Sequence, residues 1–95
     1  MSDLHARFVI RPDVVFRTLG TEALLLNLES GMYYGLNPVG TRAWELLQTN
    51  DVAGTCDALA VEFEAPVARI REDVLALVGT LVEKGLVEPA GAAAD

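Results

Sequence analysis

The hydrophobic pattern of this sequence changes once, near Asn37, from a repeat of two residues to a repeat of about 3.6 residues. Before that point lie three segments rich in β-branched, aromatic and leucine residues, which we predict as strands: 14–18, 22–28 and 32–36. After it the apolar residues recur at helical spacing. A run of strands followed by a run of helices is typical of an α+β domain in which the helices cover one face of an antiparallel sheet.

The second and third predicted strands form a hairpin whose register decides which side chains face the core. We predict a three-residue loop, Glu29-Ser30-Gly31, with Gly31 in the left-handed conformation. This loop gives the pairs Leu28–Met32, Leu26–Tyr34 and Leu24–Leu36, which share one apolar face. The opposite face then carries Ala23, Leu25, Asn27, Tyr33 and Gly35. A slip of one residue would exchange the two faces.

Capping residues mark three helix starts. Asn37-Pro38 combines an Asn cap with Pro at the first helical position, Asp51 can cap a second helix, and Pro66 falls in the first turn of a third. The third helix has its main apolar stripe at Val67, Ile70, Val74, Leu77 and Leu81. Gly85 supplies a left-handed stop after Lys84, and Leu86 can pack back on the helix.

The third helix also carries a second apolar row, formed by Leu75, Val78 and Val82. A terminal helix that only covers one sheet face needs a single row. The second row therefore indicates either a helix wedged between the other two or a helix face that meets a partner.

A chain of 95 residues forms one domain. We predict that residues 9–88 fold and that 1–8 and 89–95 are flexible tails. No apolar run approaches the roughly 18 residues of a membrane span, and no secretory signal is visible. The single cysteine agrees with a reducing compartment, so we expect a cytoplasmic protein with no membrane partner.

Acidic residues outnumber basic ones by 14 to 7, which gives a net charge of −7. Residues 43–95 hold three basic and ten acidic residues, so the whole excess lies in this part of the chain. Proteins that bind nucleic acids gain most of their affinity by neutralising phosphates. The charge therefore argues against a nucleic-acid partner.

The sequence contains no arrangement of reactive groups that is typical of an enzyme. The single histidine, His5, falls in the predicted tail, and Cys56 lies on an apolar helical stripe as a small buried residue. There is no Cys-x-x-Cys pair and no Gly-rich phosphate loop. We interpret the neighbouring acids Glu72 and Asp73 as part of a solvated helix face and not as a catalytic pair of carboxylates. We expect no catalysis, no metal and no cofactor.

The strand at 32–36 contains neither a charge nor a proline, whereas the strand at 14–18 carries Arg17 and follows Pro12. Proteins usually protect sheet edges with such residues. The unprotected edge suits β-augmentation, in which an extended peptide adds a further strand. The second apolar row of the third helix could then form one side of a groove that selects side chains.

Two segments carry a resemblance to a known family. The run from Leu24 to Gly40, LLLNLESGMYYGLNPVG, is followed by Ala43-Trp44-Glu45-Leu46-Leu47, and the chain closes with Asp73-Val74-Leu75, Leu81 and Lys84-Gly85-Leu86-Val87. Over about residues 9–87 the sequence resembles the PqqD-like proteins. Members are winged-helix-like domains that bind the leader of a ribosomally made precursor peptide and present it to a modifying enzyme.

The resemblance implies a site and partners for this chain. The leader would dock as a strand along Met32, Tyr33, Tyr34 and Gly35, against helix residues Ile70, Arg71, Val74, Leu75 and Val78. The implied partners are the precursor peptide and a separate maturation enzyme, such as a radical-SAM enzyme or a leader peptidase. The alternative is a winged-helix DNA-binding regulator with Arg69 and Arg71 on its reading helix, which the acidic charge opposes.

Overall fold

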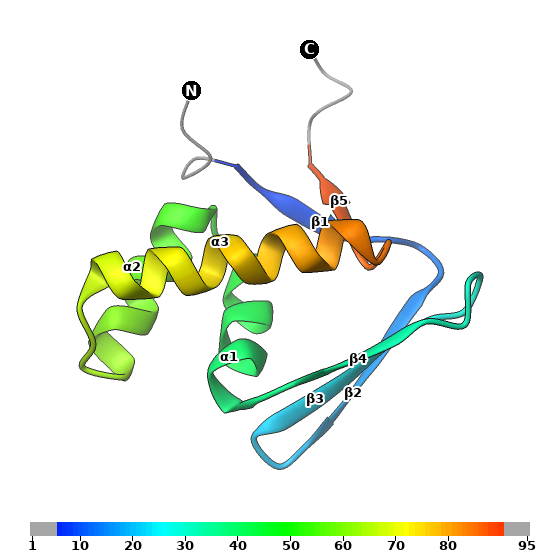
Figure 1. The fold of residues 1–95 in the computed structure, drawn as a ribbon, viewed down its shortest axis with the longest axis horizontal. Helices are drawn as coiled ribbons and strands as arrows, with labels where there is room; N and C mark the ends of the chain where they lie inside the picture. Colours follow the sequence, from blue (N-terminus) through cyan, green and yellow to red (C-terminus); the bar gives the residue numbers. More distant parts are fainter. Residues whose placement is uncertain (1–5, 91–95) are drawn as a thin grey trace.

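The computed structural model describes residues 6–90. The elements follow in the order β1 (Phe8–Ile10), β2 (Val14–Leu19), β3 (Glu22–Asn27), β4 (Tyr33–Leu36), α1 (Pro38–Leu47), α2 (Val52–Glu62), α3 (Val67–Glu83) and β5 (Val87–Pro89). Strands β2, β3 and β4 form an antiparallel sheet in that order, and β1 pairs with β5 in a second, two-stranded sheet. In Figure 1, α3 lies between these two sheets. The predicted α+β class, with a three-stranded sheet followed by three helices, is confirmed.

The register of the β3–β4 hairpin differs by one residue from our prediction. Leu25 pairs with Tyr34 and Ala23 with Leu36, and residues 28–32 connect the two strands. The core face of β3 therefore carries Ala23, Leu25 and Asn27. Leu24 and Leu28, which were predicted to face the core, are 46% and 60% exposed, and Met32 is also exposed.

The side chain of Asn27 explains this register. Its Oδ1 accepts hydrogen bonds from the backbone N–H groups of Glu29 and Ser30, at 2.9 and 3.1 Å. Its Nδ2 donates to the carbonyl oxygen of Gly85 at 2.8 Å. Because these hydrogen bonds satisfy the buried amide, Asn27 stays on the core face of β3, which fixes the register of the hairpin. The outer face of β3 carries Leu24 and Leu26 and the core face a single leucine, Leu25, so counting apolar residues favoured the wrong face.

The predicted helix boundaries agree closely with the structure. Oδ1 of Asn37 accepts from the N–H of Gly40, and Oδ1 of Asp51 accepts from that of Gly54, so both side chains cap their helices. Gly85 has a φ of 72°, and the Leu86 N–H donates to the Leu81 carbonyl oxygen, as in a Schellman motif. Pro66 precedes α3 as its N-cap instead of lying in the first turn.

The two-stranded sheet of β1 and β5 was not predicted. Phe8 pairs with Pro89, so the predicted tail boundaries at residues 8 and 89 fall within this sheet. The Ala90 N–H also donates to the carbonyl oxygen of Arg7 at 2.8 Å. The remainder of the two predicted tails, with His5, lies outside the described residues.

The core has two clusters. One joins the inner face of the three-stranded sheet to Trp44, Leu81 and Leu86, and the other lies among the three helices. Leu77 packs against both clusters. Val78 of the second apolar row is buried in the helical cluster, whereas Leu75 and Val82 are partly exposed. Within residues 6–90, none of the helices combines the length and the apolar character needed to span a membrane.

Candidate functional site

Strand β4 forms one edge of the three-stranded sheet and has a free row of backbone groups. The Asn27 N–H donates to the Met32 carbonyl oxygen at 2.8 Å, and bonded and non-bonded pairs alternate along an antiparallel ladder. Tyr34 therefore directs its N–H and C=O toward Leu25. The N–H and C=O groups of Tyr33 and Gly35 point instead toward the open side of β4.

No segment among residues 6–90 covers this edge. β1 and β5 pair with each other in a separate sheet, so neither adds to β4. The side chain of Tyr33 is 70% exposed. The opposite edge of the sheet, on β2, is partly closed because the Val14 N–H donates to the Arg11 carbonyl oxygen. The prediction of an open, uncharged edge at this strand agrees with the arrangement observed.

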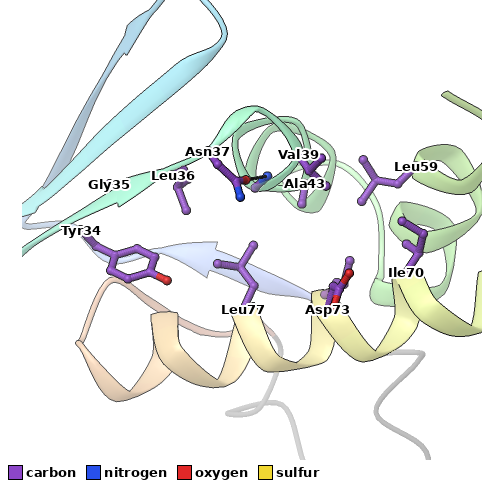
Figure 2. A pocket seen from close by; sticks show the side chains of 12 residues that line it. Tyr34, Gly35, Leu36, Asn37, Val39, Ala43, Leu59, Ile70, Asp73 and Leu77 are labelled. Carbon is purple, nitrogen blue, oxygen red and sulfur yellow. Dashed lines mark hydrogen bonds between the residues drawn. The ribbon is translucent and has the colours of Figure 1, made fainter. Parts of the chain in front are cut away.

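A cavity of about 490 Å³ lies beside this edge, between β4, the start of α1 and the middle of α3. We call it the β4–α3 groove; Figure 2 shows its side chains facing one another across the opening. It is lined by Tyr34, Gly35, Leu36, Asn37, Val39, Gly40, Ala43, Leu59, Ile70, Asp73, Val74 and Leu77. Most of these residues are apolar, so the groove is suited to hold apolar side chains of a strand lying along β4.

The N-cap of α1 shapes one side of the groove. Asn37 accepts the N–H of Gly40 at 2.7 Å, which fixes the first turn of α1 directly after β4. A Cβ atom at Gly40 would lie 3.1 Å from Asn37 Oδ1 and 3.4 Å from Leu36 Cδ2. Glycine at this position therefore lets the helix start close against the end of the strand.

Tyr34 closes one end of the groove. Its ring is half-buried against the sheet core, and Lys84 Nζ lies 5.7 Å from the ring centroid. This distance is within the range of a cation–π contact. The contact links β4 to the end of α3, so the strand and the helix that border the groove are held together at this point.

The structure brings only part of the predicted site together. Tyr34, Gly35, Ile70 and Val74 line the groove. Met32 and Tyr33 are exposed beside it, at the start of β4. Arg71, Leu75 and Val78 do not line it. Val78 is 7% exposed and packs in the helical core, where the more deeply buried Ile70 and Val74 also lie. The contact roles of Arg71, Leu75 and Val78 stay predictions.

Helical geometry explains why these residues lie elsewhere. Successive residues of an α-helix are rotated by about 100°, so Asp73 and Leu77 lie on one flank of the stripe formed by Ile70 and Val74. Arg71, Leu75 and Val78 lie on its other flank. The periodicity identified the stripe but not which flank faces β4. Asp73 and Leu77 were therefore missed as site residues, although Leu77 was predicted as part of the stripe.

The first turn of α1 was missed as well, although the sequence held a signal for it. Asn37-Pro38 follows β4 without a linker, and the first turn of a helix that starts there must border the end of the strand. Val39 and Gly40 occupy this turn and line the groove.

The described residues show no cluster of reactive side chains near the groove. Among residues 6–90, no three His, Cys, Asp or Glu side chains gather closely enough to hold a metal ion. Cys56 is fully buried, and burial raises the pKa of its thiol despite the opposing charge of Arg71. A buried thiol of raised pKa is a poor nucleophile.

The fold resembles solved structures of peptide-binding proteins. One, "TbiB1 in Complex with the TbiA(beta) Leader Peptide", is 31% identical, with a TM-score of 0.78 over 83% of this chain and 93% of that one. Another, "Lasso peptide synthetase B1 complexed with the leader peptide", is 28% identical, with a TM-score of 0.80 over 88% and 100% of the two chains. No curated protein matches the sequence.

A match to a family model identifies the family of this chain. The model described as coenzyme PQQ synthesis protein D (PqqD) matches residues 22–87. The match begins with β3 and ends at the first residue of β5, so it includes the hairpin, the three helices and the whole β4–α3 groove. This span is more than half of the 95 residues, and the chain belongs to the PqqD family.

Proposed function

We propose that this protein binds the leader segment of a ribosomally made precursor peptide as an added strand on β4. The observation that carries the proposal is the open edge of β4 directly beside the β4–α3 groove. The backbone groups of Tyr33 and Gly35 would bond the leader main chain. Alternate leader side chains would enter the groove. The two similar structures are complexes with leader peptides, which supports this proposal.

The protein acts as a non-catalytic adaptor in this proposal. It holds the precursor and so raises the local concentration of substrate at a separate maturation enzyme. The buried Cys56 and the lack of a metal-binding cluster within residues 6–90 support a binding role. The similarity to a lasso peptide synthetase B1 supports a lasso-type precursor. The partner in this proposal is a leader peptidase or another modifying enzyme.

A variant of the strand edge tests the proposal. Tyr33→Pro removes the N–H that faces the open side of β4, and we expect it to weaken leader binding by about tenfold. Tyr33→Ala keeps the N–H and serves as the matched control, with an expected change of less than about threefold. The probe is a fluorescein-labelled synthetic leader of the precursor encoded beside the gene, measured by fluorescence anisotropy. Unchanged affinity in a folded Tyr33→Pro variant would exclude docking at β4.

The DNA-binding alternative is not supported. Arg69 is exposed but stands near Asp73 on the same helix, and Arg71 is half-buried. The net charge is −7, and the similar structures are described as complexes with leader peptides. A gel-shift assay at low salt checks this point, since binding by phosphate neutralisation is strongest there. We expect no retardation of duplex DNA.

A further inference from the structure

Strand addition alone does not determine the register of a bound peptide. Backbone hydrogen bonds repeat along the edge, so a shift of two residues restores the same bonding pattern and the same side-chain directions. Apolar groove contacts distinguish such shifts only weakly when the peptide contains several apolar residues. A specific leader therefore requires a side-chain contact at a defined place along β4.

The end of β4 borders two hollows. The β4–α3 groove shares Gly35, Leu36 and Asn37 with a second hollow of about 380 Å³, which Leu19, Glu22, Ala23 and Leu24 complete. Each hollow contains one carboxylate, Asp73 in the first and Glu22 in the second, and neither contains a basic residue. In Figure 2, the Asp73 side chain stands between those of Leu77 and Ile70 on α3.

Neither carboxylate forms an ion pair within residues 6–90, although Arg69 lies one turn from the exposed Asp73 on α3. The ion pairs of this part of the chain join Arg11 to Glu88 and Arg42 to Glu45 and Glu62, all outside the two hollows. At the opposite end of β4, Lys84 lies over the ring of Tyr34. A positive charge therefore lies beside Tyr34, whereas the charged groups that line the two hollows at the other end of β4 are the carboxylates of Asp73 and Glu22.

We propose that Asp73 is a specificity-determining residue that sets the leader register by binding a lysine or arginine side chain of the leader. This inference rests on the proposed function. The basic residue lies where the leader strand passes Leu36 and Asn37, with its side chain turned toward α3. Glu22 adds negative charge at the same end of the edge. A slip of two residues moves the basic group by about 7 Å and separates the pair.

A double-mutant cycle tests the contact. The probe is the labelled leader described above, together with variants in which each lysine or arginine is replaced singly by glutamine. We expect Asp73→Asn to weaken binding about three- to fivefold, and one leader substitution to do the same. When Asp73→Asn is combined with that leader substitution, the second change has little further effect on the affinity, because each change alone already removes the same ion pair. Glu72→Gln, an exposed neighbour that does not line the groove, is the control and leaves the affinity unchanged.

A charge exchange gives a second test. Asp73→Lys weakens binding of the natural leader, and replacing its interacting basic residue by glutamate restores most of the affinity. The inference is overturned if the leader contains no lysine or arginine, if the effects of the two changes are additive, or if the exchange fails to restore binding. If any of these outcomes is found while Tyr33→Pro still weakens leader binding, the leader docks on β4 without the Asp73 contact, and the proposed function stands. If the leader does not bind at all, both fail.

Discussion

The side-chain amide of Asn27 donates a hydrogen bond to the carbonyl oxygen of Gly85 at 2.8 Å, joining the end of β3 to the end of α3. These residues are 58 positions apart in the sequence. The same side chain accepts two backbone N–H groups of the following loop. Asn27 therefore fixes both the hairpin register and the position of the hairpin relative to the helix that borders the groove.

Replacing Asn27 tests this role. Asn27→Ala removes three part-buried hydrogen bonds and the packing of a buried side chain, so we expect a loss of about 2–3 kcal/mol in the free energy of unfolding. Urea denaturation measures it. Ser30→Ala, which loses a single exposed hydrogen bond to the Met32 N–H, is the control and is expected to change stability by less than about 0.5 kcal/mol. A loss below about 0.5 kcal/mol for Asn27→Ala would contradict the role given to this residue.

Two glycines near the end of α3 are expected to respond in opposite directions. Gly85→Ala places a side chain at a φ of 72° with its Cβ 3.2 Å from Asn27 Nδ2, so we expect a loss of about 1–2 kcal/mol. Gly79→Ala adds a methyl group within the helix, where nothing lies within 4 Å, and is expected to stabilise by about 0.5–1 kcal/mol. Thermal and urea unfolding of both variants measure the difference. Equal effects would show that the backbone conformation of Gly85 is not required.

The two flanks of α3 can be separated by binding measurements. Leu77 lines the groove, whereas Leu75 was predicted as a contact but does not line it. We expect Leu77→Ala to weaken leader binding about fivefold, and Leu75→Ala to change it by less than about twofold. Fluorescence anisotropy with the labelled leader measures both affinities at a temperature where each variant is folded. The reverse ranking would place the leader on the flank that the sequence alone suggested.

The ion pair between Arg42 and Glu62 gives a prediction on pH. The Arg42 Nε donates to Glu62 Oε1 at 2.9 Å and its Nη2 to Oε2 at 3.0 Å. The hydrogen bond from Arg42 lowers the pKa of Glu62. A carboxylate whose pKa is lowered by folding stabilises above its unfolded pKa of about 4.3, and the effect is lost as the pH falls through the folded pKa.

We therefore expect Glu62→Gln to lower the unfolding midpoint temperature slightly at pH 7, and the difference from the original protein to vanish near pH 2. Differential scanning fluorimetry across this range measures it. Glu72→Gln removes the same charge outside the ion pairs of residues 6–90 and is the matched control. A difference for Glu62→Gln that persists at acidic pH would mean that the lost ion pair is not its cause.

Local signals predicted the elements of this fold better than their long-range partners. Asn37-Pro38 and Asp51 marked helix starts because capping depends on residues within one turn. The pairing of Phe8–Ile10 with Val87–Pro89 was missed, since two short segments at opposite ends of the chain leave no local pattern. The predicted hairpin register was wrong because Asn27 forms a hydrogen bond with Gly85. The residues near Asn27 in the sequence give no sign of this long-range contact.

In the candidate site, too, local features could be predicted from the sequence and long-range ones could not. The free edge of β4 could be predicted, because the absence of charge and proline between Met32 and Leu36 is a local property. Asp73 could not be identified as a groove residue from the sequence. Its place depends on the rotation of α3 relative to β4, which contacts such as that of Lys84 with Tyr34 help to hold.

The pairing of β1 with β5 has a practical consequence. The Ala90 N–H donates to the Arg7 carbonyl oxygen, so the two ends of the described chain leave the domain side by side. In Figure 1 this small sheet lies across α3 from β4. A reporter protein or an enzyme joined directly before Arg7 or after Ala90 would therefore attach across α3 from β4, and such a fusion leaves the β4 edge open.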